Sequence, residues 1–198
     1  MSHSNSEVSI CNTALNMLGA NNIISLTEDS KNARLCNQRF HSVRDAVFRE
    51  HTWNCLVKRV QLPQEIDKPS HEFQFQYLLP ADTIKVLSIG SRDDGTHSDL
   101  SDGFRFKVEG RKILTNEEEV FLTYSAQIED VVQLDSLLVE CLATRLAAEI
   151  AYAITSSVAL SKQLKDDYAE KLRIARHADA TEGTPDVVDS SSFINSRY

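Results

Sequence analysis

Residues 132–154, VQLDSLLVECLATRLAAEIAYAI, decide the fold of this chain of 198 residues. Apolar residues cover most of a helical wheel over this stretch: Leu134, Leu137, Leu138, Cys141, Leu142, Leu146, Ala147, Ile150, Ala151 and Ile154. A helix that is apolar on nearly every side must be buried on most sides, either by neighbouring helices or by another subunit. The stretch therefore predicts the central helix of a bundle.

Charged residues interrupt this stretch at Arg145 and Glu149, which are one helical turn apart. The simplest interpretation is an ion pair along the helix, worth a few tenths of a kcal/mol. Because buried charges need partners, one of the two could instead pair across a subunit boundary. Trp53, the only tryptophan, is typical of a core or interface anchor. Trp53, Arg145 and Glu149 are therefore the candidate subunit-interface residues.

Helical spacing of apolar residues recurs on both sides of the chain's middle. It predicts a helix from about residue 7 to 18, closed by Gly19, and a second over residues 31–50, capped by Ser30. A further helix is predicted from about Ser161, where Leu164, Tyr168 and Leu172 follow at four-residue steps. These helices form the partners that the central helix needs.

The middle of the chain shows alternation of apolar and polar residues instead. Strands are predicted at residues 73–77, 84–89, 104–108, 112–114 and 120–124, with a tight turn at 109–111. We expect them to form one antiparallel meander with a single apolar face.

These patterns predict an α+β fold that is mainly α. Residues 1–62 and 130–180 are expected to form an antiparallel helix bundle, and residues 63–129 an inserted small β-sheet domain. Residues 181–198 are expected to form a flexible C-terminal docking tail. The tail is polar but ends in Phe193, Ile194, Arg197 and Tyr198, a combination typical of a docking peptide.

Composition excludes several functional classes. The net charge is −8, and residues 61–130 carry seven Lys or Arg against fourteen Asp or Glu, so a protein that grips nucleic-acid phosphates is not expected. No run approaches the ~20 apolar residues of a membrane span, so stable membrane insertion is not expected either. The four cysteines form no CxxC pair, which argues against a zinc site and fits a reducing cytoplasm.

Motifs of catalysis or cofactor binding are missing as well. There is no glycine-rich phosphate loop, HExxH or GxSxG. Cys55 and His51 could form a nucleophile and its base, although core and surface roles are far commoner for such residues. The acidic loop over residues 93–102 resembles a calcium loop, but neither nearby glycine fits the required register. We therefore predict no catalytic residue, no cofactor and no metal.

Several segments resemble one known family. They are NTALNMLG at residues 12–19, ISLTEDSKNAR at 24–34, RD at 44–45, HTWN at 51–54, YLLPAD at 77–82, ED at 129–130 and NSRY at 195–198. Together they resemble the head-to-tail adaptor, or tail tubular protein A, family of short-tailed bacteriophages. The resemblance extends over nearly the whole chain and is most specific in its N-terminal third.

The resemblance implies a structural virion protein rather than an enzyme. Copies in that family form a dodecameric ring between the portal protein and the tail nozzle, assembled in the cytoplasm of the host bacterium, and DNA passes through the ring. The C-terminal tail reaches the portal, which makes Phe193, Ile194, Arg197 and Tyr198 the expected portal-docking residues. A lumen lined with carboxylates would let DNA slide without sequence-specific binding. The alternative is a virion-associated peptidoglycan hydrolase with carboxylates from residues 61–130, since such activity is credited to some relatives.

Overall fold

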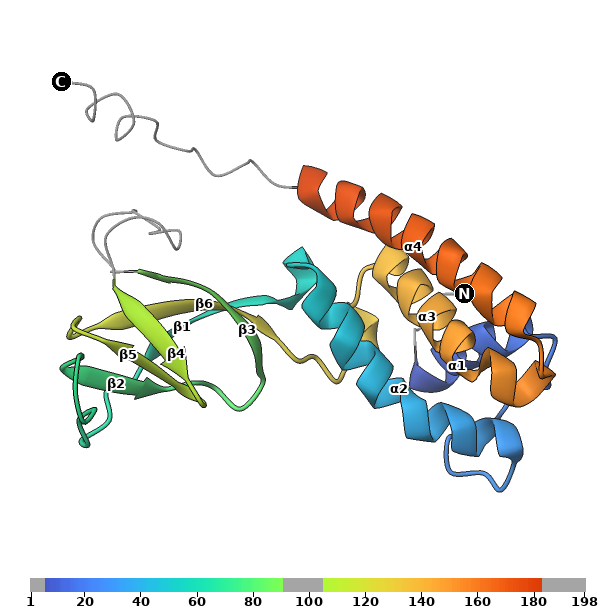
Figure 1. Cartoon of the computed structure of the whole chain (residues 1–198), viewed down its shortest axis with the longest axis horizontal. Helices are drawn as coiled ribbons and strands as arrows, with labels where there is room; N and C mark the ends of the chain where they lie inside the picture. Colours follow the sequence, from blue (N-terminus) through green and yellow to red (C-terminus); the bar gives the residue numbers. More distant parts are fainter. Residues whose placement is uncertain (1–5, 91–104, 183–198) are drawn as a thin grey trace.

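A computed structural model describes residues 6–90 and 105–182 and shows the mixed α+β fold expected from the sequence. Helices α1 (Glu7–Met17), α2 (Lys31–Glu50), α3 (Ser136–Thr155) and α4 (Val158–Thr181) gather at one end of the molecule. The strands gather at the other end, inserted between the two helix pairs in sequence (Figure 1). Short 3₁₀ turns, Asn54–Leu56 and Val131–Gln133, lead out of and back into the helical unit.

Helix ends follow local capping chemistry. Asp135 accepts hydrogen bonds from the backbone N–H groups of Leu137 and Leu138, so α3 begins at Ser136, four residues later than predicted. Ser156 adopts a left-handed conformation with φ of 55° and ends α3. Ser157 then caps the N–H of Leu160, so α4 begins at Val158 rather than at Ser161. The predicted helices are confirmed, with their ends moved by these caps.

Six strands form two antiparallel three-stranded sheets. The first has the order β1 (Val57–Leu62), β6 (Val120–Ala126), β3 (Thr83–Gly90), and the second the order β2 (Phe75–Leu78), β5 (Lys112–Thr115), β4 (Phe106–Glu109). The prediction of one meander is wrong, because only β4 and β5 are both consecutive and paired. Gly110, with φ of 60°, makes the tight turn between them.

The first strand was not predicted from the sequence. Lys58, Arg59, Val60 and Gln61 are all exposed, so β1 lacks the apolar alternation that marks a half-buried strand. It forms because its backbone pairs with β6 along its full length. The β unit therefore starts at Val57, before the expected boundary at residue 63.

Two hydrophobic clusters hold the molecule together. The larger lies within the helical unit, and the smaller combines Leu62, Ile89 and Leu122 of one sheet with Tyr77 and Ile113 of the other. The two sheets therefore share one core.

Polar contacts join the helical unit to the sheets. Arg49 of α2 donates to the carbonyl of Ile84 at 2.7 Å, and Gln127 donates to Asp45 at 3.1 Å. Near the same junction, Asp82 accepts hydrogen bonds from Lys58 at 2.9 Å and from the Tyr124 hydroxyl at 3.1 Å. Asp82 thus links the start of β3 to both β1 and β6.

Acid should weaken this junction. Burial raises the pKa of Asp82, but the hydrogen bonds from Lys58 and Tyr124 outweigh it and hold the pKa below its usual value. A carboxyl group with a lowered folded-state pKa contributes stability that is present above its unfolded pKa, near 4, and is lost as pH falls through the folded pKa. We expect stability against urea to fall below about pH 4, and less steeply in Asp82→Asn than in the parent chain. Identical slopes in the two chains would contradict the role given to Asp82.

Candidate interaction site

Helix α3 is enclosed mainly by its own chain. Helices α1, α2 and α4 all pack against it, and Leu138, Cys141, Leu142, Leu146 and Ala147 are at most 1% exposed. The small residues Ala143 and Ala151 are at most 1% exposed as well. Of the two partners that the sequence left open, the structure supplies neighbouring helices, so burial of α3 does not require a second subunit.

The charged pair within α3 also finds partners inside the chain. Arg145 lies 3.4 Å from Glu149, as the simpler interpretation predicted. Glu149 forms a shorter ion pair with Arg39 of α2 at 2.7 Å, and the Arg145 guanidinium stacks on the Tyr168 ring of α4 at 5.3 Å. These contacts tie α2, α3 and α4 together. Both residues therefore have partners within the chain, and neither needs one from another subunit.

Trp53 is fully buried, at 0% exposure, so another subunit cannot reach it. Its indole N–H donates to the carbonyl of Val47 at 3.1 Å, and its ring lies edge-on to His51 at 4.9 Å. It therefore serves as the core anchor at the end of α2, and not as a subunit-interface residue.

The last turn of α4 is fixed to the end of α2. The Asp179 carboxylate, 8% exposed, accepts from the Asn54 N–H at 3.0 Å and lies 3.1 Å from His51 Nε2. The Asn54 side chain donates back to the Asp179 carbonyl at 2.7 Å. Arg176 donates to the Glu50 carbonyl at 2.6 Å, which satisfies an unpaired group at the end of α2. The point from which the C-terminal segment leaves the helical unit is therefore fixed.

This cluster does not resemble a nucleophile–base pair. Burial, with the nearby Asp135 and Asp179 carboxylates, raises the pKa of the Cys55 thiol. A nucleophilic cysteine needs a lowered pKa. The cluster has the chemistry of a structural joint.

Two carboxylates of the β unit, Glu72 and Asp82, are poor candidates for the general acid that a glycosidase needs. A hydrogen bond from Lys107, with the nearby Arg105, holds the pKa of Glu72 below its usual value, and the pKa of Asp82 is lowered as well. A general acid requires a raised pKa. Both groups are therefore ionised near neutral pH.

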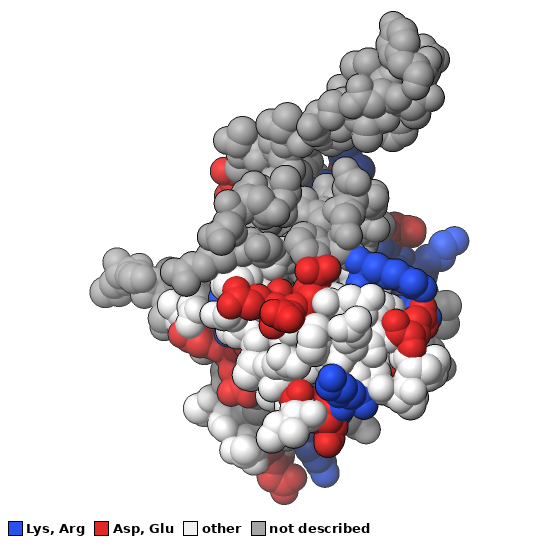
Figure 2. All heavy atoms as spheres, turned by 90° about the vertical axis from the view of Figure 1, so that its left-hand side faces the viewer, with Lys and Arg blue, Asp and Glu red and all other residues white. Residues whose placement is uncertain are grey.

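The end of the molecule formed by the sheets carries acidic and basic side chains side by side (Figure 2). Residues Glu117, Glu118 and Glu119 form a turn beside Tyr77, whose hydroxyl donates to the Glu117 carbonyl at 2.7 Å. Burial raises the pKa of Tyr77, and these three carboxylates raise it further. The turn is a local concentration of negative charge.

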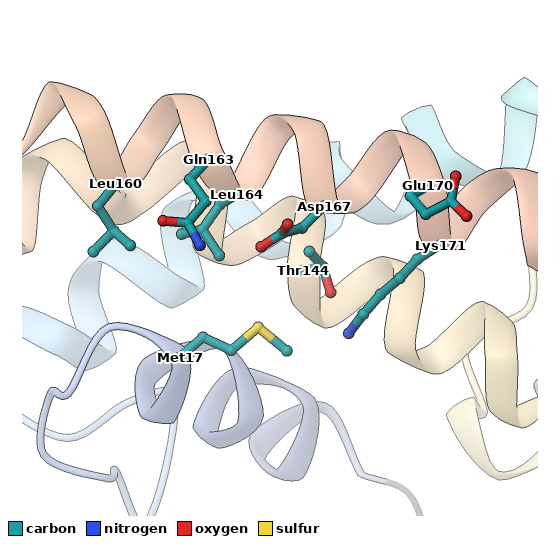
Figure 3. Close-up of a pocket in the computed structure, with 8 residues that line it drawn as sticks. All are labelled: Met17, Thr144, Leu160, Gln163, Leu164, Asp167, Glu170 and Lys171. Carbon is teal, nitrogen blue, oxygen red and sulfur yellow. The ribbon is translucent and has the colours of Figure 1, made fainter.

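A shallow groove lies on the surface beside α3. It has a volume of about 460 Å³ and lies between α4 and the end of α1, and Thr144 of α3 lies at its base (Figure 3). Met17 of α1 and Leu160 and Leu164 of α4 form its apolar walls. Thr144 is fully buried and its hydroxyl donates to the Glu140 carbonyl of its own helix at 2.8 Å, so it needs no partner in the groove. The groove favours apolar side chains.

The expected portal-docking residues, Phe193, Ile194, Arg197 and Tyr198, and the acidic loop over 93–102 lie outside the described residues. Within residues 6–90 and 105–182 no cluster of His, Cys, Asp or Glu could hold a metal ion. No helix of that part of the chain is long and apolar enough to cross a membrane.

Sequence reasoning had no access to the Asp179 joint or to the groove, because both depend on contacts between distant parts of the chain. The four-residue spacing of Leu164, Tyr168 and Leu172 did predict the helix α4, and Leu164 lines the groove. No protein-family model matches the chain, and no curated protein sequence matches it significantly.

Proposed function

We propose that this chain is a structural head-to-tail adaptor of a short-tailed bacteriophage. In this proposal, copies form a ring between the portal protein and the tail nozzle, and DNA passes through the ring without being bound. The C-terminal residues attach each copy to the portal. The chain joins other proteins and performs no chemistry.

The observation that carries the proposal is that residues of the segments resembling the family fix the joints of this fold. The Asn12 side chain makes two hydrogen bonds with the backbone of Ile23, at 2.9 and 2.8 Å, and so fixes the loop between α1 and α2. Trp53 anchors the end of α2, and Asn54 holds the last turn of α4. Asp82 links three strands of the chain. Residues in a catalytic motif would converge on one site, whereas these are spread over the joints of the fold.

Two further features agree with a connecting role. The fixed end of α4 would deliver the C-terminal residues from a defined point, so that identical copies can engage a symmetric portal. The negative charge of the chain, including the Glu117–Glu119 turn, would repel DNA from a surrounding ring. Because α3 is covered within the chain, ring formation must use exposed surfaces of the helical unit or the sheets.

Sedimentation velocity with the portal protein of the same phage tests the proposal. We expect the free chain to sediment as a monomer or a weak oligomer, and to co-sediment with the portal as added mass. If all of the chain still sediments at the rate of the free protein when it is mixed with the portal at micromolar concentration, the proposal is contradicted. A clearing band on peptidoglycan gels, lost on substitution of a single carboxylate, would favour the hydrolase instead.

A further inference from the structure

The groove beside α3 has one unpaired charge at its rim. Glu170 is paired with Arg173 at 2.6 Å, and Lys171 with Glu140 at 3.5 Å. Asp167 is exposed and forms no ion pair among the described residues. A segment that combines apolar side chains with one cation would therefore match both the walls and the rim.

We propose that the groove binds the chain's own last residues, 193–198, in the free protomer. Their sequence, FINSRY, offers Phe193 and Ile194 for the apolar walls. Arg197, the only Lys or Arg after residue 176, is the cation for Asp167. The inference rests on the proposed function, since the same residues would dock to the portal. The groove then stores the docking segment until a portal competes for it.

The length of the chain permits this contact. From Asp167 to Glu182 the helix advances about 22 Å, at 1.5 Å per residue. Residues 183–193 can extend up to about 36 Å, so Phe193 can return past Asp167. Tethering gives a short segment an effective concentration in the millimolar range, far above that of a second copy in micromolar solution. The occupant is therefore the segment of the same chain.

Disulfide trapping in the full chain tests the inference. Gln163→Cys places a thiol at the groove, and Asn195→Cys places one in the C-terminal segment, both in a Cys55→Ser background. Ala169→Cys with Asn195→Cys is the matched control, because Ala169 is exposed on the same helix and nearer to the start of the segment, yet does not line the groove. With oxidised glutathione, we expect the intramolecular disulfide to form at least tenfold faster at residue 163 than at 169. Equal rates, or disulfide-linked dimers as the main product, would overturn the inference.

Charge reversal provides a second measurement. Asp167→Lys should slow trapping at residue 163 several-fold, and Arg197→Glu should restore it in the double variant. Asp166→Lys makes the same change in charge one residue away, outside the groove, and should have little effect. A loss with Asp166→Lys equal to that with Asp167→Lys would contradict the pairing. No portal is present in these mixtures, so failure of trapping leaves the adaptor proposal intact, and failure of portal binding leaves the trapping result intact.

Discussion

A chain that ends at residue 191 is expected to lose attachment to the portal while keeping its fold. The missing residues include Phe193, Arg197 and Tyr198, and aromatic and arginine side chains contribute most to compact interfaces. The buried residues of both hydrophobic clusters lie between Ile10 and Ala175. We expect affinity for the portal to fall at least 100-fold, about 2.7 kcal/mol, with the far-UV circular dichroism spectrum of the fold unchanged. Co-sedimentation and circular dichroism measure the two quantities.

Substitutions in the full chain control for the change in length. Phe193→Ala with Tyr198→Ala should reproduce most of the loss, whereas Ser190→Ala with Ser191→Ala should leave the affinity unchanged. Normal attachment by the truncated chain would refute the docking role of the C-terminal residues.

Trp53→Ala is expected to destabilise the chain by about 3–5 kcal/mol, because it removes a fully buried aromatic ring and leaves a cavity. It also leaves the Val47 carbonyl without its indole donor. A loss of this size is a large part of the 5–15 kcal/mol that stabilises a typical domain. Urea unfolding followed by far-UV circular dichroism measures it.

The matched control is Tyr152→Ala, since Tyr152 is an aromatic residue on α3 but is 60% exposed. We expect this change to cost less than about 1 kcal/mol. Trp53→Phe should fall between the two, because it keeps most of the packing and loses the hydrogen bond. If Trp53→Ala cost no more than Tyr152→Ala, the residue would not be the core anchor described above.

The helices could be predicted because their signals are local. Apolar spacing identified all four α-helices of the described chain, and Ser30 was correctly read as the N-cap of α2. The ends of α3 and α4 were displaced because several residues nearby could serve as caps, and only the backbone geometry selects Asp135 and Ser157. Local sequence patterns therefore predicted which helices form better than they predicted where those helices begin and end.

The pairing of the strands could not be predicted, because it depends on partners far away in sequence. β1 lies next to β6, about sixty residues later, and carries no apolar alternation of its own. A meander is the simplest order for consecutive strands, but β3 pairs with β6 rather than with β4. Long-range backbone pairing decided the topology.

The candidate sites divide in the same way. The Arg145–Glu149 pair was visible from its spacing, while its partners Arg39 and Tyr168 were not. The apolar sequence of α3 correctly predicted that this helix is buried. It did not decide whether neighbouring helices or another subunit bury it. Since helices of the same chain cover it, the proposed joining role depends on the C-terminal residues and on exposed surfaces.

Electron microscopy of the portal, with and without this chain, tests the adaptor role most directly. We predict an additional ring of density on the tail-facing side of the portal, into which copies of the α+β fold can be placed around a central channel. A portal whose density is unchanged at saturating concentrations of the chain would contradict that role.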